Sequence, residues 1–287
     1  MTHVAVVSDN SCDVDEELAR ELGLVLAAPH VIVDRTDYRN RLDISTESLL
    51  EIQRRPAAKV STAACSPGEY VAAYREALQR APAVICTAMA RRVSGTFDVC
   101  ERARELLGQA DITVVDSEAM HAGLGIINVA AAFEARAGRT KEEVLALVRH
   151  LIPRTRFLVT AETAEFMRRG GRLVRSEDGS SNLEGLRPIV SVGNSGWVVI
   201  GEASSRDESI RALLARMEHD LEGMPGWYPM APIRAAIVHA GSAAEAAELR
   251  RHVTERWNCR EVYAWVYGPA GVAHIGPGAL GIAYQAL

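Results

Sequence analysis

The chain has 287 residues, of which 48% are hydrophobic and 24% charged, with a formal net charge of −5. This acidic balance argues against nucleic-acid binding, which relies on a basic surface. No apolar run approaches the ~18 residues of a membrane span, and the N-terminus carries no leader pattern. At ~100–200 residues per domain we therefore expect a cytoplasmic protein of two domains, residues 1–153 and 154–287.

The first half alternates short apolar runs with helical patterns. The expected strands are residues 4–8, 24–33, 59–62, 83–87 and 112–116. The expected helices are residues 14–22, 46–54, a helix opened by Ser66 and Pro67, and residues 95–107, 120–136 and 140–151. This alternation predicts parallel strands joined by right-handed crossovers, and hence a three-layer α/β/α domain.

The second half has a different pattern. A strand at 157–160 and a short helix at 162–168 precede a hairpin at 188–192 and 197–200, with a four-residue loop at 193–196. Two Ser…Glu capping boxes, Ser205 with Glu208 and Ser242 with Glu245, open helices to about 221 and 256. Further strands are expected at 235–239, 262–266 and 279–284. We predict a smaller α/β domain with a mixed sheet.

The stretch from residue 89 to 99 is the strongest candidate for a binding site. A buried strand ends before it, and a helix begins within it. Ser94 is a natural N-cap, Gly95 lets a ligand approach the backbone, and Thr96 adds a second hydroxyl. Free amides and the positive end of the helix dipole favour an anion at such a junction. The alternative interpretation is that Ser94 only caps its helix.

Thr62 is a second candidate, because it lies at the end of a strand-like run. We predict that it lies in a strand-to-helix loop before the capping box of Ser66, Pro67 and Glu69. Ligand crevices of parallel sheets lie beyond the carboxyl ends of the strands. Thr62 and Ser94, together with Ser8 and Asp9, are therefore expected at such ends.

His274 lies between two apolar residues in a glycine-rich segment, where a core histidine and an anion donor are both possible. With Ser94 it also suggests a serine esterase or phosphatase, which needs the imidazole within hydrogen-bond reach of the hydroxyl. The residues around Ser94 do not form a G-x-S-x-G elbow, which weakens this alternative. We expect a non-catalytic protein.

The remaining motifs indicate no cofactor and no metal. Residues 276–281 match G-x-G-x-x-G, but the chain ends six residues later, with no room for the helix and strand of a dinucleotide site. The five cysteines form no C-x-x-C pair, so neither a disulfide framework nor a zinc site is expected. Arg168, Arg169, Arg172 and Arg175 form the densest basic cluster, which is either a solvated helix end or a docking site for an anionic group.

Six blocks, taken together, resemble the DegV family across nearly the whole chain. They are S-D-N-S-C-D at 8–13, Thr62 before Ser66-Pro67, V-S-G-T-F at 93–97, F-M-R-R-G-G-R at 166–172, L-R-P-I at 186–189, and H-x-G-P-G-A-L-G at 274–281. The resemblance implies a three-layer α/β domain, a smaller α/β domain, and a fatty acid held between or within them. It also implies that a separate fatty-acid kinase receives this long-chain acid and phosphorylates its carboxylate.

The resemblance further implies roles for single residues. Thr62 and Ser94 would hydrogen-bond the carboxylate, with Gly95 and Thr96 beside them, and His274 would lie near it. Arg172 would serve the head group, and Arg168, Arg169 and Arg206 would dock the kinase. The affinity would come from the tail, because fifteen methylenes at ~0.8 kcal/mol each amount to roughly 12 kcal/mol before binding entropy is subtracted.

The sequence departs from this family pattern between residues 174 and 184. Relatives commonly have an apolar helix there, whereas this segment is polar and charged. Such a stretch cannot bury an apolar face, so a mobile loop and a more open pocket are expected.

Overall fold

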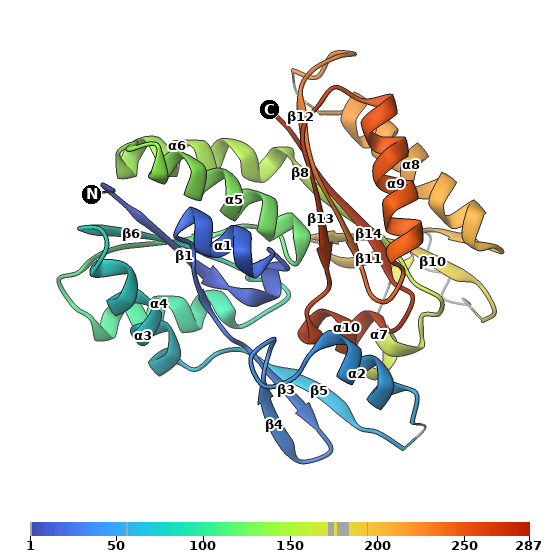
Figure 1. Ribbon diagram of the computed structural model, residues 1–287, viewed down its shortest axis with the longest axis horizontal. Coiled ribbons are helices and arrows are strands. Elements are labelled where there is room, and N and C mark those ends of the chain that lie inside the picture. The colour runs from blue at the N-terminus through green and yellow to red at the C-terminus, as the bar shows by residue number, and fades with distance from the viewer. Residues whose placement is uncertain (1, 56, 172–174, 177–183, 194, 225) are drawn as a thin grey trace.

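The computed structural model describes residues 2–55, 57–171, 175–176, 184–193, 195–224 and 226–287. Within these residues the strands form a four-stranded, a three-stranded and a seven-stranded sheet. Figure 1 shows the four-stranded and seven-stranded sheets on either side of a helical layer, with the three-stranded sheet below them.

The four-stranded sheet is parallel throughout, in the order β2-β1-β6-β7. Its strands are β1 (Ala5–Asp9), β2 (Val25–Ala27), β6 (Ala83–Ala88) and β7 (Asp111–Asp116). All of β6 is buried, as expected for a parallel strand covered on both faces. One face carries α3 (Pro67–Leu78) and α4 (Thr96–Leu106), and the other carries α1 (Glu16–Leu22), α5 (Ala122–Arg136) and α6 (Lys141–Leu151). The predicted three-layer arrangement is confirmed.

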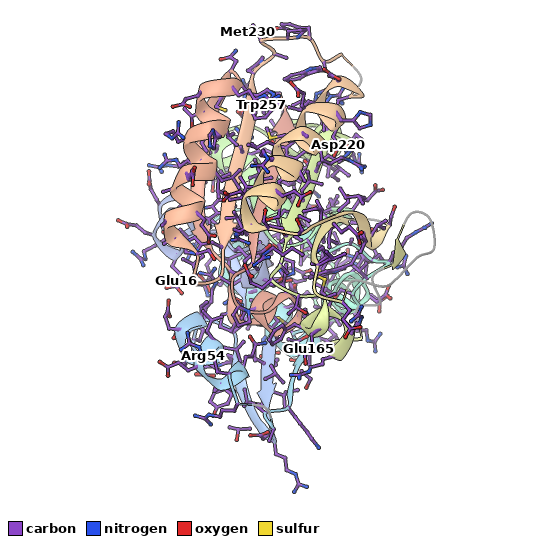
Figure 2. The ribbon with its side chains drawn as sticks, turned by 90° about the vertical axis from the view of Figure 1, so that its right-hand side faces the viewer. Glu16, Arg54, Glu165, Asp220, Met230 and Trp257 are labelled. Carbon is purple, nitrogen blue, oxygen red and sulfur yellow. The ribbon has the colours of Figure 1, made fainter. Side chains whose placement is uncertain are left out.

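The seven-stranded sheet is mixed, in the order β13-β12-β14-β8-β10-β11-β9. Its strands are β8 (Thr155–Thr160), β9 (Arg175–Ser176), β10 (Arg187–Gly193), β11 (Gly196–Ala203), β12 (Ile233–His239), β13 (Cys259–Val266) and β14 (Leu280–Ala286). On its outer face lie α8 (Arg206–Glu222) and α9 (Ala243–Arg256), which run side by side in Figure 2. The predicted mixed sheet of the second half is therefore also confirmed.

Helix α5 joins the two large sheets. Twelve of its fifteen residues are buried, so its apolar surface runs all around the helix rather than along one stripe. It contacts β1 and β6 on one side and β8, β12 and β14 on the other. The result is five layers, in which α5, flanked by α1 and α6, forms the middle layer, and α5 is the helix of this layer that packs against both large sheets.

The three-stranded sheet is antiparallel and corrects two expectations. It consists of β3 (His30–Val33), β4 (Thr36–Arg39) and β5 (Val60–Ala63), and it contacts α10 (Pro269–Ile275), which packs on α2 (Thr46–Gln53). The single strand expected at 24–33 is divided into β2 and β3, because Pro29 has no N–H to continue the ladder. Thr62 was expected in a loop of the parallel sheet, and this is wrong, since it lies within β5.

Several local predictions also differ from the structure. A helix that was not expected from the sequence, α10, contains His274. Gly193 pairs with Gly196, so the hairpin connection has two residues rather than four. Short helical segments are η1 (Asn10–Cys12), η2 (Ile152–Arg154) and α7 (Glu165–Arg169). The polar segment predicted to be mobile lies mostly outside the described residues.

Candidate functional site

A cavity of about 210 Å³ lies at the carboxyl ends of the parallel strands β1, β6 and β7. Its polar wall contains four hydroxyl residues, two histidines and one carboxyl residue: Ser11, Thr62, Ser94, Thr96, His121, His274 and Asp9. The apolar wall includes Met89, Val93, Met120 and Trp197. The chain therefore places a polar pocket where open α/β sheets bind ligands.

Thr62 on β5 and His274 on α10 contact each other where these two elements pack together. Thr62 Oγ1 lies 2.7 Å from His274 Nε2, which is hydrogen-bond distance, and the histidine is 8% exposed. Two glycines allow α7 to pack this closely against α10. A Cβ atom on Gly170 would lie 2.3 Å from His274 Nδ1, and one on Gly276 would lie 2.2 Å from the ring of Phe166. The glycines of these two sequence blocks, 166–172 and 274–281, therefore allow α7 and α10 to pack closely around His274.

Ser94 and Thr96 form the start of α4. Gly95 is the N-cap and has no side chain to cap the helix, whereas Ser94 Oγ accepts a hydrogen bond from the Thr96 amide at 3.2 Å. The two hydroxyl oxygens are 2.8 Å apart. The prediction that Ser94 is the N-cap is wrong by one position, but its hydroxyl still lies at the positive end of the helix.

Asp9 brings a carboxyl group to the same cavity. It accepts hydrogen bonds from the Ser11 amide at 2.9 Å and from the Tyr70 hydroxyl at 3.1 Å, and its side chain also bonds the Ser11 hydroxyl. Burial raises the pKa of Asp9, and these hydrogen bonds oppose the rise without cancelling it. Both carboxylate oxygens are therefore already engaged with the protein rather than with the cavity.

The fold and the sequence blocks have counterparts among known proteins. A family model, described as the uncharacterised DegV family, matches residues 3–287. The chain belongs to the DegV family. A DegV domain-containing protein of Caldanaerobacter subterraneus is 26% identical over 219 residues, which cover 76% of this chain and 78% of the relative. Protein DegV of Bacillus subtilis is 24% identical over 284 residues, which cover 98% of this chain and 99% of the relative.

Solved structures of DegV proteins share this fold. A DegV family protein of Thermus thermophilus superposes with a TM-score of 0.90 at 26% identity, over 100% of both chains. DegV of Bacillus subtilis superposes with a TM-score of 0.85 at 23% identity, also over 100% of both chains. Both of those proteins are described as fatty-acid binding. The expected membership of the DegV family and its expected fold are confirmed.

In this DegV protein the predicted head-group residues lie together, with one exception. Thr62, Ser94, Gly95, Thr96 and His274 all line the cavity, although they come from three separate parts of the chain. Arg172 lies outside the described residues.

The arginines predicted to dock a partner differ in their surroundings. Arg168 and Arg169 are exposed at the end of α7, where Arg169 pairs with Glu165. Arg206 is instead 14% exposed; its Nε donates to Glu245 at 2.7 Å, and its Nη1 lies 3.6 Å from Glu162. Arg206 is therefore held between two carboxylates within the protein.

Sequence reasoning missed two residues of this DegV site, His121 and Trp197. His121 is the N-cap of α5 and has a φ of 51°, a backbone conformation that a sequence pattern does not reveal. Trp197 was assigned to a hairpin strand, and its position on the cavity depends on how the seven-stranded sheet packs on α5. Within the described residues its indole N–H has no hydrogen-bond acceptor.

Within the described residues, no group of three or more His, Cys, Asp or Glu side chains is placed to hold a metal ion. Among the described helices, none is long and apolar enough to cross a bilayer.

Proposed function

We propose that this protein binds a long-chain fatty acid, with the carboxylate in the cavity between Thr62, Ser94 and His274. The observation that supports this is the gathering of hydroxyl and imidazole groups in one pocket at the positive end of α4. Hydroxyls, an imidazole and free helix amides can donate hydrogen bonds to a carboxylate. The fatty acids bound by DegV proteins of similar fold support the same ligand class.

The tail needs more space than the head-group cavity offers, because small-molecule sites usually have about 300–1,000 Å³. A second cavity of about 420 Å³ begins where the pairing of β8 with β10 ends, beyond the pair of Leu158 and Ser191 on the side of Phe157 and Val192. Val192 lines this second cavity and is paired across the hairpin with Trp197, which lines the first. We assign the acyl tail to this neighbouring cavity, reached past Trp197.

The first test is chemical. We expect organic extraction of the denatured, purified protein to release fatty acid that mass spectrometry identifies. The stripped protein should bind hexadecanoate on titration. Absence of lipid in the extract together with no binding on titration would contradict the proposal.

Replacing Ser94 by Ala tests the head-group contact. The expected loss is ~0.5–1.5 kcal/mol, or about two- to tenfold in hexadecanoate affinity, the net contribution of one hydrogen bond. Ser61→Ala is the matched control, because Ser61 precedes Thr62 on β5 and its side chain points to the opposite face. Equal affinities of the two variants would rule out this role for Ser94.

Gly193→Phe tests the assignment of the tail. Gly193 lines the second cavity, and a Cβ atom there would lie no nearer than 3.4 Å to any neighbour. We expect hexadecanoate affinity to fall at least about tenfold, equivalent to two buried methylenes, while decanoate binding changes little. Gly201→Phe on β11 is the control, because its Cβ would have similar room, 3.7 Å, outside the cavity. A uniform loss for both acids would contradict the assignment.

We further propose that the bound acid is presented to a fatty-acid kinase that docks on Arg168 and Arg169. These guanidinium groups are exposed at the end of α7 and suit an anionic partner surface, whereas Arg206 is only 14% exposed and lies between Glu245 and Glu162. The double variant Arg168→Glu, Arg169→Glu should bind hexadecanoate normally but no longer support its phosphorylation by the kinase. Full phosphorylation by this variant would place docking elsewhere.

The serine esterase or phosphatase using Ser94 and His274 stays the alternative. Such an enzyme needs the imidazole within hydrogen-bond reach of the nucleophile. Here Ser94 bonds Thr96, and His274 meets Thr62 instead. The geometry therefore favours binding, and ester turnover that disappears in Ser94→Ala would reverse this preference.

A further inference from the structure

Three non-glycine residues with left-handed backbone conformations meet behind the head-group cavity. Asp13 follows η1 with φ 61°, Arg41 follows β4 with φ 63°, and His121 precedes α5 with φ 51°. Positive φ is uncommon for such residues and is maintained only where the surroundings enforce it, most often at functional sites. The three residues are also in mutual contact through Asp13.

Asp13 is completely buried and stands between the other two. Its Oδ1 accepts a hydrogen bond from the Gly268 amide at 2.8 Å and lies 3.8 Å from Arg41 Nη2. Its Oδ2 lies 3.4 Å from His121 Nδ1, and within the described residues neither of these two atoms has a geometrically complete hydrogen bond. A buried carboxylate oxygen without a full partner is costly, so the fold keeps this arrangement against a free-energy penalty.

The ring of His121 is fixed in direction. Tyr267, Phe157 and Trp197 surround it, with ring centroids 5.7, 6.2 and 6.2 Å away. Nδ1 is the ring nitrogen that faces Asp13, and within the described chain Nε2 makes no hydrogen bond and is not closed off from solvent. Because His121 lines the head-group cavity, Nε2 is the atom available to a ligand there.

We propose that His121 is a second head-group residue, which hydrogen-bonds through Nε2 to the acid and shares its proton. Asp13 acts as a positioning residue, because its carboxylate favours the tautomer of His121 that carries the proton on Nδ1, which leaves the lone pair of Nε2 for the ligand. The inference rests on the proposed function, since it assumes that the cavity holds an acid. His30 shows the same arrangement elsewhere in the chain, with Asp37 2.9 Å from one ring nitrogen and Glu69 3.1 Å from the other.

This role predicts selectivity for the free acid over a ligand of equal shape that has no acidic proton. The methyl ketone in which CH₃ replaces the acid OH is such a ligand. It buries the same chain, but it offers His121 neither a proton nor a charge to share. The two ligands therefore separate the head-group contact from the burial of the tail.

The experiment titrates dodecanoic acid and its methyl-ketone analogue into the wild type, His121→Gly, Asp13→Asn and His239→Gln. Glycine adopts positive φ without strain, so His121→Gly removes the imidazole while relaxing the backbone. We expect His121→Gly to weaken acid binding about tenfold or more and to leave ketone binding unchanged. His239→Gln, a half-buried histidine outside the cavity, should change neither affinity.

Asp13→Asn keeps the size of the side chain but not its charge. We expect a smaller loss of acid affinity with ketone binding unchanged, and ¹⁵N NMR should show that the tautomer of His121 has changed. In the wild type, adding the acid should shift the Nε2 signal of His121. If the acid leaves this signal in place, or if His121→Gly weakens acid and ketone equally, the inference is wrong.

The experiment also distinguishes this inference from the function on which it rests. A wild type that binds neither ligand would contradict fatty-acid binding itself. A wild type that binds the acid, loses affinity in Ser94→Ala and keeps it in His121→Gly would contradict only the role of His121.

Discussion

At the scale of a single residue, His30 on β3 pairs with one carboxylate on β4 and another on α3. Its ring nitrogens lie 2.9 Å from Asp37 on β4 and 3.1 Å from Glu69 at the start of α3. Burial lowers the pKa of His30, but hydrogen bonds and charges from Glu69 and Asp37 outweigh it, so the pKa is raised above 6.5. When the imidazole is protonated, its ion pair with Glu69 therefore links the three-stranded sheet to α3.

This raised pKa predicts how stability depends on pH. The stabilisation from His30 is fully present below about pH 6.5, the unfolded value, and is lost as the pH rises through the folded pKa. His30→Gln should therefore lower the melting temperature most at acidic pH and least at alkaline pH. Thermal melts of both proteins across pH 5.5–9 check this, and a difference that grows with pH would contradict it.

His239 gives a control with the opposite sign. Burial lowers its pKa below 6.5, so the folded state binds fewer protons than the unfolded state, and stability is lost as the pH falls. His239→Gln should remove part of this acid sensitivity, and the same melts measure it.

Single residues also show what the sequence could reveal about the site. Ser94 was found from a local pattern, a hydroxyl at a strand-to-helix junction, and such a pattern depends little on the rest of the fold. Thr62 was placed in the wrong element, because a short run such as 59–62 does not show which sheet it joins. His121 was missed, because its position depends on a backbone conformation and on a partner, Asp13, more than a hundred residues away.

At the scale of an element, α5 is packed too tightly to accept even a methyl group at Gly125. A Cβ atom there would lie 2.4 Å from the carbonyl oxygen of Cys12 and 2.8 Å from the ring of Trp265. Gly125→Ala should lower the free energy of unfolding by about 1–3 kcal/mol despite the better helix propensity of alanine. Urea denaturation measures the change.

Gly68 in α3 provides the matched control for Gly125. Its Cβ atom would meet only Ser66 Oγ at 3.8 Å, so the same substitution adds helix propensity without a clash. Gly68→Ala should raise the free energy of unfolding by up to ~1 kcal/mol. Opposite signs for the two substitutions are the expected result, and equal effects would contradict the packing argument.

Helix caps show where local sequence is sufficient and where it is not. The capping box predicted at Ser66 and Glu69 is formed, and another joins Thr140 and Glu143 at the start of α6. At Ser205 the side chain accepts from the Glu208 amide, but the Glu208 carboxylate accepts from the amide and hydroxyl of Ser204 rather than from the Ser205 amide. Ser242 makes no side-chain cap; its backbone is not extended, with φ −114° and ψ 48°, and the Glu245 carboxylate accepts from Arg206 of α8. A local pattern reveals neither this backbone conformation nor the long-range ion pair.

At the scale of the whole molecule, the shared helical layer decides how independent the two halves are. The predicted boundary at residues 153 and 154 falls just before β8, the first strand of the seven-stranded sheet. Yet α5, which precedes that boundary, packs against β8, β12 and β14. Alternation of strands and helices could predict both sheets, but not that they would share one layer of helices.

Sharing a layer predicts that the halves do not fold separately. A fragment of residues 1–153 would expose to water the apolar surface of α5 that packs on the seven-stranded sheet. An exposed apolar patch of this kind favours aggregation over a stable monomer. We expect one cooperative thermal transition for the full chain and a fragment that melts earlier and binds a hydrophobic dye. Two separate calorimetric transitions in the full chain would contradict this, and would support the division at residue 153 as an independent folding boundary.

The pocket that joins Thr62, Ser94 and His274 has a mechanical consequence. Thr62 lies on the antiparallel sheet, Ser94 precedes α4 on the parallel sheet, and His274 lies in α10 near the C-terminus. A bound ligand that contacts all three would therefore link three parts of the backbone that are far apart in the sequence. Filling the pocket should then slow proteolytic nicking at sites far from it, such as the connection between β3 and β4, because binding lowers the population of opened states throughout the chain.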